Sequence, residues 1–159
     1  MDFRERLQKA ANRGAATRAT REDAKQAEAI SEEESRRRHS QHRLSLSEHL
    51  EACLKQLADN FPGFRYETIV DERGWGAAVS RDDLGIERGK RKNFFSRLVL
   101  LIEPFNEFRV LSVAAKGAVR NKESFTRGHY EPLAEVDEDR FRELIELWVL
   151  DYAEDYAAA

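Results

Sequence analysis

Residues 94–115 read FFSRLVLLIEPFNEFRVLSVAA and hold the two most apolar runs of the chain. The first run covers 94–103 and the second covers 107–115, and the Pro-Phe-Asn triplet between them is typical of a turn. Both runs are rich in the large apolar residues that pack well on a pleated sheet. This stretch therefore predicts two antiparallel strands at the centre of the fold.

The first of these strands is apolar on both of its faces. Neighbouring residues of a strand point to opposite sides, so Leu98, Leu100 and Ile102 share one face. Val99 and Leu101 lie on the other face. A strand with this pattern is typical of a sheet that is covered on both sides. We therefore expect either one helix on each face, or both helices on one face and a partner on the other.

Two further strands are expected before this pair. Residues 64–70 alternate between apolar and charged side chains, 71–74 has the composition of a turn, and 75–80 returns as the hairpin partner. Residues 81–93 are polar with two glycines and are expected to form a loop, whereas 118–120 is expected to form a short fifth strand. On the strand at 64–70, the residues assigned to one face are Phe64, Tyr66, Thr68 and Val70.

In the sequence, one helix is predicted before the strands and another after them, because apolar residues recur every three to four positions in both segments. The first helix covers 45–60, where Ser45 and Glu48 have the spacing of a capping box. The second follows Asp137, which suits the N-cap position. Leu147 and Leu150 lie off its main stripe. The two stripes are Leu46, Leu50, Cys53, Leu54, Leu57 and Phe61, then Phe141, Leu144, Ile145, Trp148, Tyr152 and Tyr156.

Residues 1–43 have a different composition, with no proline, one glycine and many Ala, Arg, Glu, Gln and Lys residues. These are strong helix formers, yet the segment has too few large apolar residues to be held as a helix by packing in a monomer. Two alternatives remain: a frayed or disordered tail, or a long helix whose alanine stripe docks on a partner. That stripe consists of Ala10, Ala24, Ala27 and Ile30.

The fold class that follows is α+β, with an antiparallel four- to five-stranded sheet flanked by an N-terminal and a C-terminal helix and a long helical or partly disordered N-terminal extension. We expect two parts: a charged, alanine-rich helical extension at 1–43, and an α+β domain at 44–159 built as helix, antiparallel meander, helix. Strands and helices do not alternate, which argues against a doubly wound nucleotide-binding fold.

Composition excludes several classes of protein. A single cysteine in 159 residues is incompatible with a disulfide framework or a cysteine-built zinc site. The chain lacks an apolar run of the ~20 residues that span a bilayer, and its first thirty residues lack a signal-peptide core, so a cytoplasmic protein without a membrane anchor is expected. The net charge of −3 divides unevenly, with +6 at 87–127 and −8 at 131–159.

No catalytic, metal or cofactor site is predicted. His39, His42 and His49 do not have the spacing of a metalloprotease motif and are expected to be solvated surface residues. The carboxylates of Asp82 and Asp83 are expected to lie in a loop without a partner. The chain is therefore predicted not to be an enzyme, and to bind no small-molecule cofactor.

The segment 121–133 is longer and more mixed in composition than a turn requires. Its polar and aromatic residues are typical of recognition loops, so the preferred hypothesis is a non-catalytic protein-protein interaction or adaptor domain. That domain would engage a protein partner through this loop and through the N-terminal extension. A homodimer is also expected, since leftover apolar residues on the last helix would otherwise form an exposed patch. The predicted partner-binding residues are Phe125, Arg127, His129, Tyr130, Leu147 and Leu150.

The alternative hypothesis is a nucleic-acid-associated regulator. Cations next to the aromatic pair at 94–95 could neutralise phosphates and stack bases, and three arginines at 36–38 could add to them. The near-neutral total charge argues against a dedicated nucleic-acid-binding protein. The cations of this alternative site are Arg88, Lys90, Arg91 and Lys92, together with Arg36, Arg37 and Arg38.

Overall fold

The computed structural model describes residues 2–159, without the side chains of 27–30 and of Ser124. The expected stripe positions Ala27 and Ile30 therefore lie outside the described side chains. The chain divides into two units that meet between Arg37 and Arg38, six residues before the boundary expected from composition.

One helix, α1 (Phe3–Asn60), contributes to both units. In the N-terminal unit the described side chains of residues 2–33 are all exposed, and local pairs such as Arg37 with Glu34 (2.7 Å) link neighbouring turns. Each such pair stabilises a helix by only a few tenths of a kcal/mol. Among the described residues, no helix combines the length and the apolar character that crossing a membrane requires.

The unit from Arg38 to Ala159 has the α+β architecture that the sequence predicts. Its five antiparallel strands follow one another in chain order across a single sheet, and the second helix, α2 (Glu138–Ala158), comes after a short 3-10 turn at Leu133–Glu135. The strands are β1 (Arg65–Asp71), β2 (Gly74–Glu87), β3 (Lys90–Ile102), β4 (Val110–Val119) and β5 (Lys122–Pro132).

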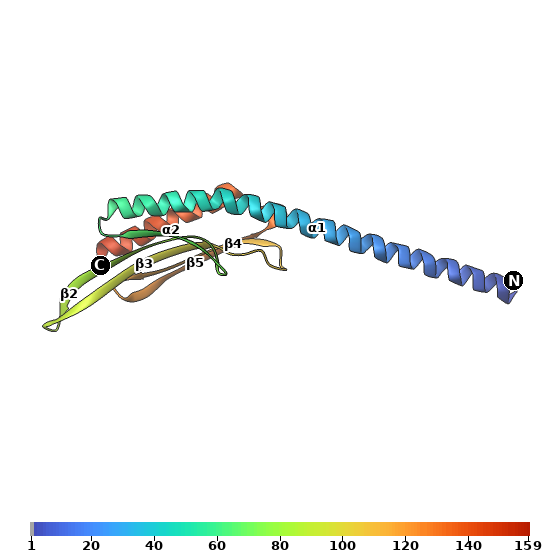
Figure 1. The fold of residues 1–159 in the computed structure, drawn as a ribbon, viewed down its shortest axis with the longest axis horizontal. Helices are drawn as coiled ribbons and strands as arrows, with labels where there is room; N and C mark the ends of the chain where they lie inside the picture. Colours follow the sequence, from blue (N-terminus) through green and yellow to red (C-terminus); the bar gives the residue numbers. More distant parts are fainter. Residues whose placement is uncertain (1) are drawn as a thin grey trace. The chain divides into compact units, whose positions relative to one another are not determined.

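Both helices pack on the same face of the sheet, which we call the inner face (Figure 1). Leu98, Leu100 and Ile102 of β3 are fully buried in one core with the apolar stripes of the C-terminal part of α1 and of α2. Val99 and Leu101, which point to the opposite face, remain half-buried. Of the two expected arrangements, the structure therefore has both helices on one side.

The segment 81–93 is not a loop, as the sequence suggested, but the far end of the β2–β3 hairpin. Strand pairing continues as far as Glu87 opposite Lys90. The turn consists of Arg88 and Gly89, both with positive φ (53° and 77°), which matches the twist of a two-residue hairpin. The error arose because charged residues and glycines masked the period-two alternation in this segment.

A second correction concerns the expected strand at 118–120 and the expected loop at 121–133. Strand β4 runs through to Val119, and a two-residue turn at Arg120 and Asn121 (φ 49° and 71°) leads directly into β5. The 121–133 segment is thus the fifth strand, not a recognition loop. Strand β4 also starts later than expected, at Val110, which leaves Phe108 exposed in the preceding turn.

The face assignment of β1 was wrong in part. Tyr66 is half-buried, but Thr68 and Val70 are exposed, and the buried residue is Ile69. Ile69 lies opposite Gly76 at the sheet edge, on the face away from the helices. Because β1 is an edge strand, its inner side is only partly covered.

The predicted capping box at Ser45 and Glu48 does not form, because α1 continues through this point without a break. Instead the Ser45 hydroxyl accepts a hydrogen bond from Arg142 of α2 (2.6 Å). The Asp137 N-cap of α2 is confirmed, since its carboxylate accepts from the Arg140 backbone N–H. The expected apolar stripe of α2 is buried or half-buried as well.

His39, His42 and His49 are not solvated surface residues, since His39 is buried and the side chains of His42 and His49 are each 23% exposed. His39 is only 3% exposed, and its Nε2–H donates to the Glu103 carbonyl oxygen at the end of β3 (3.0 Å). Burial lowers the pKa of His39 from its usual 6.5, which favours the neutral imidazole. His42 pairs with Glu138 of α2 (2.9 Å). These contacts explain why the C-terminal unit starts before residue 44.

The two faces of β3 should respond very differently to a charge. Leu100→Asp places a carboxylate in the fully buried core and is expected to abolish cooperative unfolding, because such a change costs several kcal/mol. Leu101→Asp, one residue further on the half-exposed face, is expected to retain a cooperative melt within about 2 kcal/mol of wild type. Circular dichroism melts of both variants measure this, and similar behaviour of the two would contradict the one-sided core.

Truncation should locate the stability boundary between residues 38 and 44. A chain starting at Arg38 is expected to melt like the full chain, because the described side chains of residues 2–33 are all exposed and none of residues 34–37 is buried. A chain starting at Leu44 loses the His39 and His42 hydrogen bonds and is expected to be less stable by roughly 1–3 kcal/mol. Urea denaturation of the two truncations tests this, and equal midpoints would contradict the role of the two histidines.

Candidate functional site

No described segment of the C-terminal unit covers the sheet face opposite the helices, which we call the outer face (Figure 1). Alternation along the strands assigns residues to it, because the inner neighbours are buried in the core. The residues near its centre are small or half-buried: Gly76 and Ala78 on β2, Val99 and Leu101 on β3, Ala114 on β4 and Gly128 on β5.

A hollow of about 550 Å³ lies in this face between β3 and the turn that follows it. Val99, Leu101 and Ala114 form its apolar floor. Phe105 borders it from the turn, where the ring also packs against His39 with centroids 5.9 Å apart. The small residues around the floor allow another backbone to approach the sheet closely.

Two free charges stand at opposite ends of this hollow. Lys116 lies opposite Val99 and is exposed, and Glu103 follows β3 at the other end, beside Ser112. No side-chain partner is found for either group among the described residues. Arg73 also lines the hollow, but its guanidinium is bound to Asp71 (2.8 Å), and this carboxylate holds the arginine pKa above its usual value.

None of the four residues predicted at 121–133 lines this hollow. Phe125 is buried against Tyr152 (5.9 Å), and Arg127 stacks on its ring at 4.3 Å. His129 is half-buried and bonds the Glu131 carboxylate (2.6 Å) on the inner side. Only Tyr130 is exposed on the outer face, opposite Ser112.

The remaining predicted residues are exposed or paired. Leu147 and Leu150 are 50% and 66% exposed on α2, and the homodimer contact expected there stays a prediction. Asp82 and Asp83, expected to be unpartnered, lie in β2 and both have partners: Asn93 donates to Asp82 (3.1 Å), and Arg81 donates to Asp83 (2.7 Å).

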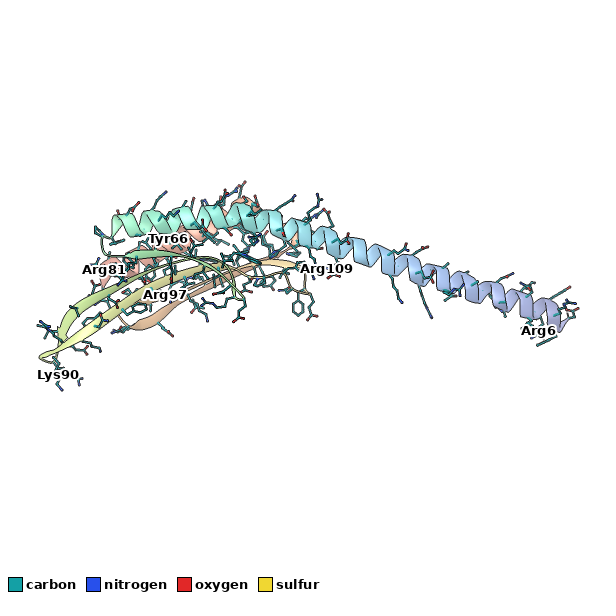
Figure 2. All side chains as sticks on the ribbon, viewed as in Figure 1. Arg6, Tyr66, Arg81, Lys90, Arg97 and Arg109 are labelled. Atoms are coloured by element: carbon teal, nitrogen blue, oxygen red, sulfur yellow. The ribbon has the colours of Figure 1, made fainter. Side chains whose placement is uncertain are left out.

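The basic residues at 88–92 of the alternative hypothesis lie at the tip of the β2–β3 hairpin, where Figure 2 labels Lys90. The three arginines at 36–38 lie on α1 instead, where Arg36 pairs with Glu32 (3.1 Å) and Arg37 with Glu34 (2.7 Å). Lys92 is paired with Glu87 (2.9 Å). Two cations of the same chain lie over the ring of Phe94, with Lys92 at 5.7 Å and Arg120 at 4.5 Å from the ring centroid. The apolar side chains of Leu84 and Ile86 near the tip are exposed.

The outer-face hollow was missed because its residues come from separate strands and a turn, and no spacing in the sequence connects them. The one available signal was the doubly apolar run at 98–102, which predicted a second face to be covered. Comparisons with protein-family models, curated proteins and solved structures give no significant match to this chain. The function is therefore inferred from the geometry.

Proposed function

We propose that the C-terminal unit is a non-catalytic protein-binding domain that takes an extended segment of a partner protein along the outer face of its sheet. One observation carries the proposal: the centre of that face is an apolar hollow between β3 and the following turn, with the helices packed on the other side. Covering Val99 and Leu101 would remove further apolar surface from water, at about 25 cal/mol per Å².

The charges at the ends of the hollow define the segment that it would fit. From Lys116 to Ser112, the neighbour of Glu103, the strand advances four residues, or about 14 Å. An extended segment covers this distance with side chains i, i+2 and i+4 on one side. The complementary segment therefore carries an acidic residue opposite Lys116, an apolar residue over Leu101 and a basic residue opposite Glu103.

Selection from a displayed random-peptide library tests this pairing. The wild-type chain should enrich peptides with oppositely charged residues four positions apart and an apolar residue midway. Leu101→Asp, expected to remain folded, should weaken binding of the selected peptides at least tenfold, or about 1.4 kcal/mol, because it places a charge on the apolar floor. Fluorescence anisotropy with labelled peptides measures the loss.

A charge reversal separates this site from adventitious binding. Lys116→Glu makes both ends of the hollow acidic, so selection on this variant should shift to peptides with two basic residues. Lys55→Glu, a reversal on the opposite helix layer, should leave the wild-type selection unchanged. Selection of the same peptides by all variants, or of no common pattern by the wild type, would overturn the proposal.

A second candidate, binding of nucleic acid, is favoured by the hairpin tip. Arg88, Lys90 and Arg91 are exposed there, at the end of a two-stranded ribbon that carries exposed Leu84 and Ile86. Ribbons of this kind enter DNA grooves, and apolar side chains at their ends wedge between base steps. Three phosphate contacts would make log Kd change with log salt by a slope of about 3.

Anisotropy titrations of a labelled DNA duplex at several salt concentrations test this second candidate. Arg88→Glu with Arg91→Glu should abolish binding, whereas Lys9→Glu with Lys25→Glu, which removes the same charge from the N-terminal unit, should leave it unchanged. Weak binding that both double variants reduce equally would show only a general charge effect, and would reject the hairpin as a nucleic-acid site.

A further inference from the structure

A separate group of side chains converges in the seam between the two helices. His49 and Cys53 are four residues apart on α1, and Glu146 faces them from α2. The His49 Nε2 atom lies 3.7 Å from the Cys53 Sγ and 3.3 Å from the Glu146 Oε1. One ligand atom from each of the three residues lies within 4.8 Å of the other two.

The two separations from the His49 Nε2 atom match the edges of a tetrahedral zinc site. With Zn–N of about 2.05 Å, Zn–S of about 2.3 Å and Zn–O of about 2.1 Å, tetrahedral angles place N and S about 3.6 Å apart and N and O about 3.4 Å apart. A half-buried imidazole at i, a thiol at i+4 and a carboxylate across the seam thus already stand near ligand spacing.

The surroundings leave a fourth coordination position open. The three residues line a groove of about 540 Å³ between the helices, with Leu57, Phe61 and Val149 on its apolar walls. Three protein ligands with one open position are typical of zinc sites that hold a water molecule or an exogenous ligand. The thiol, imidazole and carboxylate set suits Zn²⁺ better than Mg²⁺ or Ca²⁺, which prefer oxygen ligands.

We propose that His49, Cys53 and Glu146 form a three-ligand site for Zn²⁺ at the α1–α2 seam, with its fourth position open to the groove. Binding requires the Cys53 thiol to release its proton, and burial together with Glu146 raises the pKa of this thiol in the metal-free protein. A divalent cation beside the sulfur reverses that effect. The site lies on the helix layer and is independent of the outer-face hollow.

Titration of the tag-free full chain with Co²⁺, as an optical substitute for Zn²⁺, tests the site. The wild type should give one equivalent of a complex with a thiolate-to-cobalt charge-transfer band, which added Zn²⁺ removes. Cys53→Ser should lose the band, and Glu146→Gln should weaken Co²⁺ binding at least tenfold. His42→Gln is the matched control, because it removes another histidine–glutamate pair between the same helices without touching the thiol.

Thermal melts with Zn²⁺ and with a chelator provide a second readout that does not depend on colour. Zn²⁺ at 100 times its Kd should stabilise the wild type and His42→Gln by about 2.7 kcal/mol, a hundredfold change in the folding equilibrium, but not Cys53→Ser or Glu146→Gln. Metal-free melts of each variant establish that it is folded. The absence of a charge-transfer band in the wild type, or equal Zn²⁺ stabilisation of all four proteins, would overturn the proposal.

Discussion

One-sided burial of β3 is the constraint on which the rest of this structure depends. Leu98, Leu100 and Ile102 are fully buried on the inner face, and they share one core with the apolar stripes of α1 and α2. The flanking strands present smaller residues there, such as Ala77 and Ala115, which lets the two helices lie close to the sheet. At Gly117 an added Cβ would stand 3.0 Å from the Tyr152 ring, so close packing of α2 depends on a missing side chain.

The same arrangement leaves the outer face without a cover. Complete burial of a valine or leucine side chain contributes about 1.5–3 kcal/mol, so half-buried Val99 and Leu101 forgo part of that stabilisation. Two large apolar residues above the centre of a sheet, among glycine and alanine neighbours, form a surface that a second polypeptide can stabilise by covering. This physical reason places the proposed protein-binding site on the strands instead of on the helices.

The seam between the helices is held by polar contacts of a different kind. At one end, His42 bonds Glu138 and Arg142 bonds Ser45, which fixes α1 against the start of α2. Further along the seam, the His49 imidazole contacts the Glu146 carboxylate, and the Cys53 thiol lies close to both side chains. The first contacts are partly buried hydrogen bonds with a structural role. The second set differs because a thiol and an open groove accompany it.

Local sequence signals determined the type of each major element. The period-3.6 stripes predicted a helix at 45–60 and a second helix after Asp137, and the Asp137 N-cap is present as expected. The apolar run at 98–102 predicted a central strand. The positions of the tight turns were the hardest to predict from the sequence. Arg88 and Asn121 adopt positive φ there at a modest energetic cost, and the local sequence does not indicate this conformation. Two strand extensions were consequently interpreted as loops.

Tertiary structure alone decided which faces the elements share and which distant residues meet. Amphipathic stripes specify that a helix buries one side, but they do not specify which side of a sheet it covers, so both arrangements were consistent with the sequence. The burial of His39 follows from its position against the end of β3, and the hollow near Leu101 follows from having both helices on one face. His49 and Glu146 are 97 positions apart, and only the packing of α1 on α2 brings them within 3.3 Å. Periodicity reports what a single element buries, whereas a binding site depends on how several elements pack together.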